Sequence, residues 1–263
     1  MTDYSDVNRA LWNRWTRIHQ RSAFYDVDGF KAGKSSLMRI EREELGDVSG
    51  KSLLHLQCHF GLDTLSWARA GARVTGVDFA EEAIALARSL SEELSIPATF
   101  VCADLYELPE VLAERFDIVF TSYGVLPWLA DIDRWARIAA HFLKPGGTFY
   151  LVEFHPFLNV LDDTGEQITY PYFGRAEPLS FDVEGSYADP DAAFAHPSYQ
   201  WSHGLGGIVT ALLAAGLTLE FLHEFPYSVY DCFPFLEADQ PGRYVWRGRP
   251  GMVPVMFSIK ATG

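Results

Sequence analysis

The chain has 263 residues, with 21 lysines and arginines against 35 aspartates and glutamates, so its formal net charge is −14. This acidic balance argues against binding to nucleic acid, whose phosphates need basic partners, and against docking on an anionic membrane. Its hydrophobic content of 48% is typical of a folded globular protein and too high for a disordered chain. The length fits one large α/β domain, or one domain with an insertion, better than two equal domains.

Cysteine usage and the start of the chain predict where the protein works. The three cysteines, Cys58, Cys102 and Cys232, are far apart in sequence and odd in number, which predicts reduced thiols rather than a disulfide framework. The first residues contain no basic segment followed by an apolar run, so no signal peptide is expected. No uncharged apolar stretch is long enough to span a bilayer. We therefore expect a soluble, cytoplasmic protein.

Short apolar runs alternate with helical patterns between residues 51 and 147, which indicates βαβ units around a parallel sheet. The predicted strands are residues 52–58, 73–77, 98–102, 116–121, 148–154, 217–225 and 252–260. The predicted helices of this region and the tail are residues 62–70, 80–94, 131–142 and 205–215. The pattern predicts an α/β fold with a doubly wound, mostly parallel seven-stranded sheet.

Two segments interrupt this alternation. Residues 1–50 predict a helix at 7–19, an irregular stretch at 22–34 and a short helix ending near residue 45, which together form an N-terminal helical cap. Residues 156–200 hold five prolines, several aromatic residues and little periodicity, and they form an insertion after the fifth strand. Long loops of this kind are usually functional or disordered, and the aromatic residues favour a packed, lid-like segment. We expect a single domain in which residues 51–155 and 201–263 make the core.

The turn after the first strand is the expected ligand site, because open α/β sheets bind ligands beyond the carboxyl ends of their strands. Asp78 ends the second strand, twenty residues after Cys58, where a carboxylate suits the two hydroxyls of a ribose. A dinucleotide site needs three glycines so that the backbone can approach a pyrophosphate. This turn has only Gly61, with Gln57 and His59 at the other two places. A ribose-bearing cofactor without pyrophosphate is favoured over NAD.

Five segments now point to a family. They are LLHLQCHFGLDT, VTGVDFAEEAIALAR, FVCADLYEL, FDIVFTSYGVLPWL and LKPGGTFYLVE, in this order and at these spacings. The sequence resembles the class I S-adenosylmethionine-dependent methyltransferases of the small-molecule type, over roughly the central third to half of the chain. The resemblance implies a Rossmann-like fold, S-adenosylmethionine as cofactor and methyl transfer as activity.

The resemblance also implies roles for the residues that end the second, third and fourth strands. Asp78 would hold the ribose hydroxyls, and Phe79 would pack on the adenine unless it is simply a core residue. Asp104 would receive the adenine amino group, with Leu105 offering its backbone to the ring. Asp104 has a competing role as the N-cap of the helical segment that follows it. Thr121 and Ser122, at the end of the fourth strand, would lie under the sulfonium and its methyl group.

The first motif departs from the family pattern, which is usually an acidic residue followed by glycines. His55, Gln57 and His59 occupy those places here, and Gly61 alone keeps the close approach of the backbone. Gln57 and His59 are expected to contact the methionine portion of the cofactor. Asp63 is expected either to cap the following helix or to receive the amino group of the cofactor.

Candidate catalytic and acceptor-binding residues follow the fourth and fifth strands. Tyr123 and Trp128 come after the methyl-bearing end, and Tyr123 is a candidate for proton transfer if the acceptor arrives protonated. His155 alternates with Glu153, so the two are expected on one face as an acid/base pair or metal ligands, or else as structural groups. His203 is a further candidate base that would contact the acceptor. No metal site is expected.

The N-terminal cap and the insertion are the expected sources of acceptor specificity. Tyr25 lies in the irregular stretch FYDVDG and is expected to reach the cofactor or the acceptor. Residues 156–200 carry eight acidic residues and one basic residue, so a lid facing the site would favour a neutral or cationic acceptor such as an amine. A solvated acidic loop is the alternative. Aromatic residues in both segments would also suit an aromatic acceptor.

The expected partner is a small-molecule methyl acceptor, bound by a monomer or homodimer. The fourth strand is followed by TSYG, not by the Asn/Asp-Pro-Pro-Tyr cluster of enzymes that methylate amino groups in nucleic acid. Two other functions remain open on the sequence alone. One is a cofactor-binding regulatory protein without turnover, and the other is a nicotinamide-dependent oxidoreductase.

Overall fold

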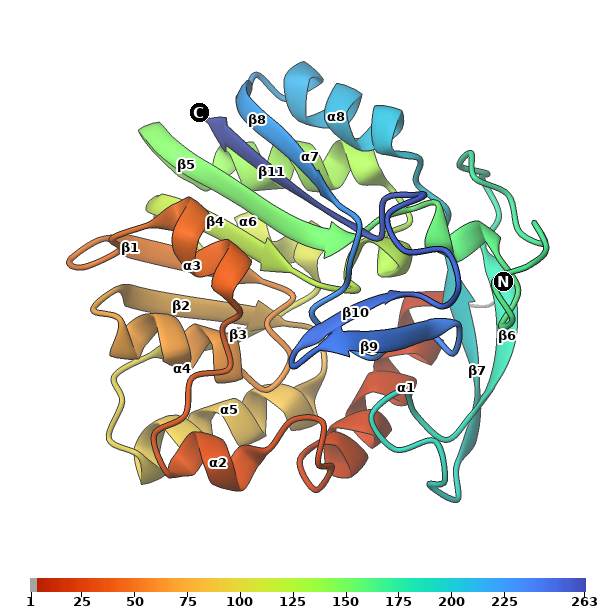
Figure 1. Ribbon diagram of the computed structural model, residues 1–263. Helices are drawn as coiled ribbons and strands as arrows, with labels where there is room; N and C mark the ends of the chain where they lie inside the picture. Colours follow the sequence, from red (N-terminus) through yellow and green to blue (C-terminus); the bar gives the residue numbers. More distant parts are fainter. Residues whose placement is uncertain (1–3) are drawn as a thin grey trace.

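A seven-stranded sheet lies at the centre of the protein, with the strand order β3-β2-β1-β4-β5-β11-β8 (Figure 1). The computed structural model describes residues 4–263, so the first three residues of the predicted N-terminal cap lie outside the described residues. The strands of this sheet are β1 (Ser52–Leu56), β2 (Arg73–Asp78), β3 (Thr99–Cys102), β4 (Phe116–Ser122), β5 (Leu143–Phe154), β8 (Thr218–Phe225) and β11 (Met256–Thr262). β1 to β5 are parallel, and β11 is antiparallel to both β5 and β8. This arrangement confirms the predicted mostly parallel sheet.

Helices cover both faces of the sheet, as a doubly wound fold requires. The helices are α1 (Tyr4–His19), α2 (Val27–Lys31), α3 (Arg39–Leu45), α4 (Leu62–Arg69), α5 (Glu81–Glu93), α6 (Leu108–Val111), α7 (Ile132–His141) and α8 (Leu205–Ala214). Trp135 of α7 and Leu212 of α8 share one apolar cluster with Leu54 of β1. Trp67 of α4 shares another with Leu53, because successive strand residues point to opposite faces. None of the helices within residues 4–263 is long and apolar enough to cross a lipid bilayer.

The N-terminal helix α1 packs against a hairpin formed within the insertion, β6 (Leu179–Glu184) with β7 (Ala195–Gln200). The Asn8 side chain donates to the Tyr199 carbonyl oxygen at 2.7 Å and accepts from the Tyr199 N–H at 2.9 Å. Trp15 Nε1 donates to the Gly185 carbonyl oxygen at 3.0 Å. The predicted cap and the predicted insertion therefore lie side by side, beyond the carboxyl ends of the parallel strands (Figure 1).

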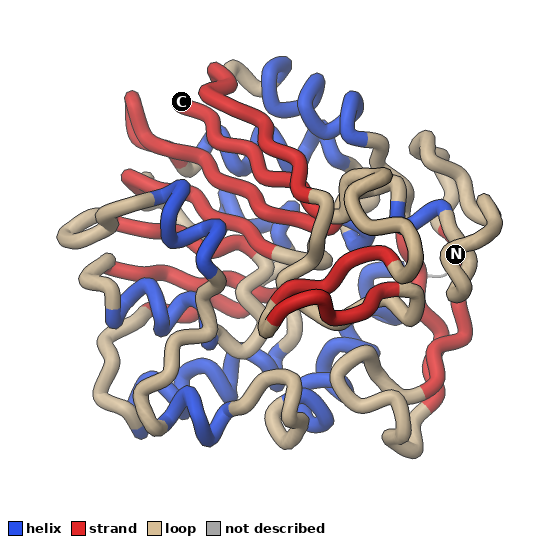
Figure 2. Tube along the Cα trace, in the orientation of Figure 1, coloured by secondary structure: helices blue, strands red, loops and turns tan. Residues whose placement is uncertain are grey.

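Three segments contain secondary structure that the sequence does not predict (Figure 2). Helix α2 interrupts the stretch expected to be irregular, the hairpin β6–β7 forms part of the insertion, and a second hairpin joins β9 (Leu236–Gln240) to β10 (Arg243–Trp246). No residue of β6 is buried, and Leu236 alone is buried in β9. β6 (LSFDVE) does alternate apolar and polar residues over six positions, so it carries a strand signal that the prediction missed, whereas β9 (LEADQ) carries little.

Candidate functional site

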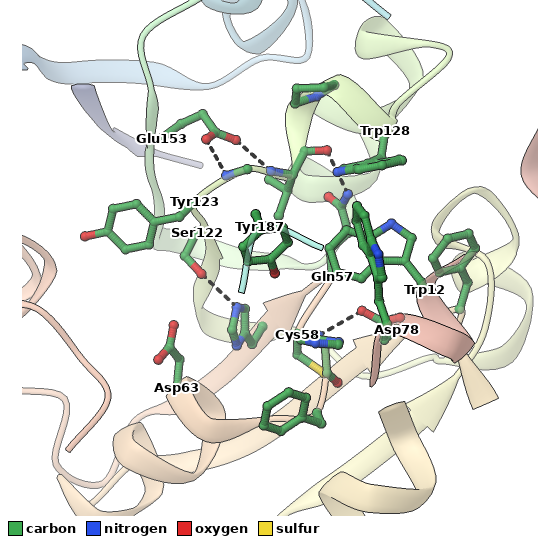
Figure 3. A pocket seen from close by; sticks show the side chains of 18 of the residues that line it. Trp12, Gln57, Cys58, Asp63, Asp78, Ser122, Tyr123, Trp128, Glu153 and Tyr187 are labelled. Atoms are coloured by element: carbon green, nitrogen blue, oxygen red, sulfur yellow. Dashed lines mark hydrogen bonds between the residues drawn. The ribbon is translucent and has the colours of Figure 1, made fainter. Parts of the chain in front are cut away.

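A cavity of about 1090 Å³ lies at the carboxyl ends of the parallel strands (Figure 3). Its lining includes Gln57 after β1, Asp78 at the end of β2, Tyr123 after β4 and Glu153, the last residue but one of β5. This is the point where the strand order reverses between β1 and β4, which is where open α/β sheets bind ligands. Pockets that bind one drug-sized ligand measure roughly 300–1,000 Å³, so this cavity is large enough for a cofactor together with a small acceptor.

The turn after β1 has a left-handed backbone at three residues: Gln57 (φ 56°), His59 (φ 50°) and Gly61 (φ 78°). This conformation costs a residue other than glycine about 1–2 kcal/mol, so the turn is strained at Gln57 and His59. Glycine is required at position 61, because a Cβ atom there would lie 2.7 Å from the Phe100 ring. The turn has the left-handed backbone conformation that glycine adopts readily at all three positions, although only one of the three residues is a glycine.

The side chains of Gln57 and His59 each leave one buried polar atom free in the cavity wall. Gln57 Nε2 donates to the Val125 carbonyl oxygen at 3.2 Å, whereas Gln57 Oε1 has no partner among residues 4–263. His59 Nε2 lies 2.9 Å from His19 Nδ1, whereas His59 Nδ1 has no partner within the same residues. Buried polar atoms are rarely left unbonded, so both atoms fit the polar groups of a ligand.

The contact between His59 and His19 joins three parts of the chain. His19 Nε2 lies 3.0 Å from Ser186 Oγ. A chain of hydrogen bonds therefore runs from the turn after β1 (the cofactor turn) through α1 to the insertion. Burial lowers the pKa of His19 to about 3 and the pKa of His59 well below its ordinary value. Both imidazoles are therefore neutral at pH 7, and they hold the cap over the turn through hydrogen bonds rather than charge.

Asp78 and Asp104 both line the cavity, and each also bonds to nearby groups of the protein. Asp78 accepts from the His59 N–H at 2.8 Å and the Ala80 N–H at 2.9 Å, and burial raises its pKa to about 6. Asp104 accepts from the Tyr106 N–H at 2.8 Å, which is the alternative helix-capping role expected of it. Each carboxylate oxygen accepts two hydrogen bonds, so both groups retain capacity for a ligand. Phe79 and Leu105 line the same part of the cavity.

Asp63 lies in the first turn of α4 and lines the cavity. It accepts a hydrogen bond from Ser36 Oγ at 2.6 Å, and burial raises its pKa. α4 begins after Gly61 with no side-chain cap, so Asp63 does not cap this helix. Of the two expected roles, the position is compatible with holding a cationic group of the cofactor.

Glu153 fixes the loop after β4, a role that the sequence did not indicate. Its carboxylate accepts from the backbone N–H groups of Gly124, Val125, Leu126 and Phe154, the last three at 2.8, 3.1 and 2.7 Å. Burial raises its pKa, and the four N–H donors oppose that shift. With its oxygens engaged in this way, Glu153 positions the loop rather than serving as an acid or base.

Three of the residues proposed from sequence do not line the cavity. Thr121 is fully buried in β4, whereas its neighbour Ser122 lines the cavity as expected. His155 is buried with Nε2 3.1 Å from Glu224 Oε1, and burial lowers its pKa. His203 Nε2 bonds to the Leu129 carbonyl oxygen at 2.7 Å. We correct these three assignments: His155 and His203 contact other groups, and Thr121 Oγ1 is buried without a partner among residues 4–263. Within residues 4–263, no group of three or more His, Cys, Asp or Glu is placed to hold a metal ion.

Tyr123, Trp128 and Tyr25 do line the cavity, as expected. The Tyr123 hydroxyl donates to Glu41 Oε2 at 2.7 Å, and burial raises the pKa of this phenol well above its ordinary value. Tyr123 is therefore a neutral phenol at pH 7 that presents its ring to the cavity. The Tyr25 hydroxyl lies 2.5 Å from the Tyr187 hydroxyl of the insertion.

Several cavity residues were not identified from the sequence. They are aromatic and come from α1, from the loop between α1 and α2, from the insertion and from the segment after β8: Trp12, Trp15, Phe24, Tyr187, Tyr230 and Phe233. The spacing of Trp12 and Trp15 indicated a core-facing helix stripe, and the other four lie in segments without periodicity. These residues meet only in the tertiary structure, so no local pattern marks them.

The acidic residues of the insertion do not line the cavity. Its lining residues from the segment 156–200 are Asn159, Tyr187 and Gln200, and none of the eight carboxylates is among them. The alternative of a solvated acidic loop therefore describes this segment. The electrostatic reason for expecting an amine acceptor is removed with it.

A pH-dependent stability is expected from His55, which lies buried beneath the cofactor turn with Nδ1 2.8 Å from Thr64 Oγ1. Burial lowers its folded pKa to about 3, below the unfolded value of about 6.5. Its stabilising contribution is complete above pH 6.5 and is lost as the pH falls toward 3. When the pH is lowered from 7 to 5, the free energy of unfolding should fall in both proteins. The fall should be about 2 kcal/mol smaller for His55→Asn than for the unsubstituted protein.

Urea unfolding at the two pH values measures this difference. His141→Asn, at an exposed position of α7, is the control and should follow the unsubstituted protein. Identical pH dependence for His55→Asn and His141→Asn would show that His55 is not held neutral by burial.

Comparison with known proteins agrees with this geometry. Residues 54–151 match the family model described as a methyltransferase domain. A ubiquinone biosynthesis O-methyltransferase of Coxiella burnetii is 29% identical over 161 residues, which cover 60% of this chain and 64% of the relative. The alignment thus spans less than two thirds of that relative's length.

Solved structures show the same fold. An S-adenosylmethionine-dependent methyltransferase from Clostridium acetobutylicum is 14% identical, with a TM-score of 0.61 over 96% of this chain and 98% of that one. The glycopeptide N-methyltransferase MtfA in complex with S-adenosylmethionine is 18% identical, with a TM-score of 0.55 over 85% and 91% of the two chains. The matched segment contains the turn after β1, Asp78 and Asp104, which are the residues that line the predicted cofactor end of the cavity. Residues 54–151 therefore match a methyltransferase domain, and the whole chain has the fold of these solved methyltransferase structures.

Proposed function

We propose that this protein transfers the methyl group of S-adenosylmethionine to a small molecule held in the same cavity. The observation that carries the proposal is one continuous cavity of about 1090 Å³. It joins the carboxylates after β2 and β3 to a region lined with aromatic rings. Because cofactor and acceptor share one space, their reacting atoms can be brought into line.

The residues present fit the cofactor. Asp78 would hold the ribose hydroxyls, with the adenine between Phe79 and Leu105 and its amino group near Asp104. The free atoms Gln57 Oε1 and His59 Nδ1, with the Asp63 carboxylate, would bond to the methionine portion. The cofactor supplies a methyl group already activated by its positively charged sulfur.

The protein's contribution to the reaction is alignment. The loop after β4, fixed by Glu153, presents Tyr123 and Trp128 to the cavity. Orientation of this kind can raise the rate by several powers of ten, because the bound acceptor is already held in the reactive orientation. The acceptor gives an electron pair to the methyl carbon, the carbon–sulfur pair stays with sulfur, and any displaced proton leaves to water.

Calorimetry with S-adenosylhomocysteine tests the cofactor site, and transfer of labelled methyl from S-adenosylmethionine to a small-molecule extract tests the activity. We expect one S-adenosylhomocysteine per chain and labelled small products. Absence of S-adenosylhomocysteine binding contradicts the proposal. Binding without transfer to any acceptor would instead indicate a regulatory protein, and displacement of S-adenosylhomocysteine by NAD or NADP would indicate an oxidoreductase.

The proposal includes the setting in which the protein acts. Its three cysteines are all unpaired, which suits a reducing compartment such as the cytoplasm. The acidic net charge is compatible with a small-molecule acceptor rather than nucleic acid. We expect the protein to be a monomer or a homodimer. Light scattering of the purified protein distinguishes these two states.

A further inference from the structure

The part of the cavity away from Asp78 is walled by aromatic rings. Tyr123 follows β4, Phe154 ends β5, and Tyr230 and Phe233 belong to the segment after β8, while Tyr187 comes from the insertion. Figure 3 shows Tyr123 on the side of Ser122 that lies away from Asp78, and Tyr187 next to Ser122 in the same view. Four different parts of the chain therefore deliver rings to one region, beyond the expected position of the methyl group.

These rings present both edges and faces. Tyr123 and Tyr230 have centroids 5.0 Å apart with planes at 79°, and Phe154 and Phe233 have centroids 5.5 Å apart with planes at 87°. Edge-to-face pairs of this kind leave ring faces available to a further ring, because offset and perpendicular contacts are the favoured ones. A flat aromatic molecule gains contacts here that a saturated molecule of the same size does not.

The charges around the cavity disfavour an anion. Lys34 is the one lysine or arginine among the lining residues within 4–263, and its Nζ lies 2.7 Å from Asp26. The lining also contains Asp63, Asp78 and Glu153. An acceptor carboxylate or phosphate would lose its water without gaining a cationic partner, which costs several kcal/mol or more.

A cationic acceptor has no dedicated counter-charge in this region either. Glu153 is engaged by four backbone N–H groups, and the carboxylates of the insertion do not line the cavity. The polar groups that remain beside the rings are neutral, among them Asn159 and the hydroxyl of Tyr230. Neutral polar groups suit the hydroxyl or neutral nitrogen of an uncharged acceptor.

We propose that the methyl acceptor is an uncharged aromatic compound of one or two rings, and that anionic and saturated analogues are rejected. This inference rests on the proposed methyl transfer. The new bond forms between the acceptor oxygen or nitrogen and the methyl carbon, while the carbon–sulfur bond breaks with its electron pair on sulfur. The proton of the acceptor heteroatom goes to water.

Three probes of matched size test the proposal on protein saturated with S-adenosylhomocysteine: 2-naphthol, 2-naphthoate and decahydro-2-naphthol. Trp12 and Trp128 line the cavity, so quenching of tryptophan fluorescence and calorimetry can both report binding. We expect 2-naphthol to bind at least about tenfold more tightly than either analogue. Equal or tighter binding of 2-naphthoate or of the saturated alcohol overturns the proposal, and so does the absence of 2-naphthol binding.

Variants locate the binding to the rings. Tyr230→Leu should weaken 2-naphthol binding about tenfold while the affinity for S-adenosylhomocysteine is unchanged. Phe233→Leu is the second variant and should give the same result if Tyr230→Leu fails to fold. Phe173→Leu, at a side chain that is 78% exposed, is the control and should bind 2-naphthol normally. Unchanged 2-naphthol affinity in the folded ring variants contradicts the assigned region.

The measurement separates the two proposals. Normal S-adenosylhomocysteine binding with no preference for 2-naphthol refutes the acceptor class and leaves the methyltransferase function intact. Loss of S-adenosylhomocysteine binding by the unsubstituted protein refutes the proposed function, on which the acceptor class depends.

Discussion

Asp78→Ala is expected to raise the dissociation constant for S-adenosylhomocysteine by about 100-fold or more. The substitution removes the carboxylate assigned to the ribose hydroxyls, and hydrogen bonds to a charged group contribute about 1.5–3 kcal/mol each. It also leaves the N–H groups of His59 and Ala80 without their acceptor, which loosens the cofactor turn. Calorimetry measures the affinity, and circular dichroism checks that the variant is folded.

Two further variants sharpen this test. Asp78→Asn keeps the size of the side chain and one acceptor oxygen, so we expect its loss of affinity to be smaller than that of Asp78→Ala. Asp133→Ala removes an exposed carboxylate from α7 and should leave S-adenosylhomocysteine binding unchanged. An Asp78→Ala protein that binds as tightly as the unsubstituted one would exclude Asp78 from the cofactor site.

Glu153→Ala is expected to lower the free energy of unfolding by about 3–5 kcal/mol. Four backbone N–H groups, those of Gly124, Val125, Leu126 and Phe154, lose the acceptor that they share. Each unsatisfied buried donor costs about 1–3 kcal/mol, and water entering the space offsets part of the total. Urea unfolding followed by circular dichroism measures the change.

A graded response would identify the hydrogen bonds as the cause. Glu153→Gln retains one acceptor oxygen but turns an amide N–H₂ toward the donors, so its stability should fall between those of the alanine variant and the unsubstituted protein. Glu110→Ala, at an exposed position of α6, should change stability by less than about 0.5 kcal/mol. If Glu153→Ala unfolds at the same urea concentration as the unsubstituted protein, Glu153 does not fix the loop.

The central sheet could be predicted because its strands are buried on both faces. Runs such as Leu53–Leu54 in β1 place consecutive apolar residues on opposite faces, and both faces are covered by helices. The two hairpins were missed for different reasons: β6 (LSFDVE) alternates apolar and polar residues but lies in an otherwise aperiodic insertion, and β9 (LEADQ) has one buried residue. β9 is held to β10 by backbone pairing, and this pairing leaves little trace in the apolar pattern of β9.

The site residues were predicted correctly where the end of a strand of the sheet places them. Residues placed by the end of a strand, such as Asp78 and Gln57, reach the cavity as predicted, because parallel strands end at one edge of the sheet. Ser122 reaches the cavity as expected and Thr121 does not, since successive strand residues point to opposite faces. His155 follows the last residue of β5. The alternation of side chains between the two faces of a strand therefore does not extend from Glu153 to His155.

The exposed carboxylates of the segment 156–200 have a consequence for the protein in concentrated solution. This segment holds eight acidic residues and one basic residue, and its carboxylates lie outside the cavity. At neutral pH, neighbouring molecules therefore meet like-charged surfaces and repel one another. The repulsion weakens near the isoelectric point of about 4.9, where colloidal stability should be lowest. Crystallisation screens are best begun a little above this value.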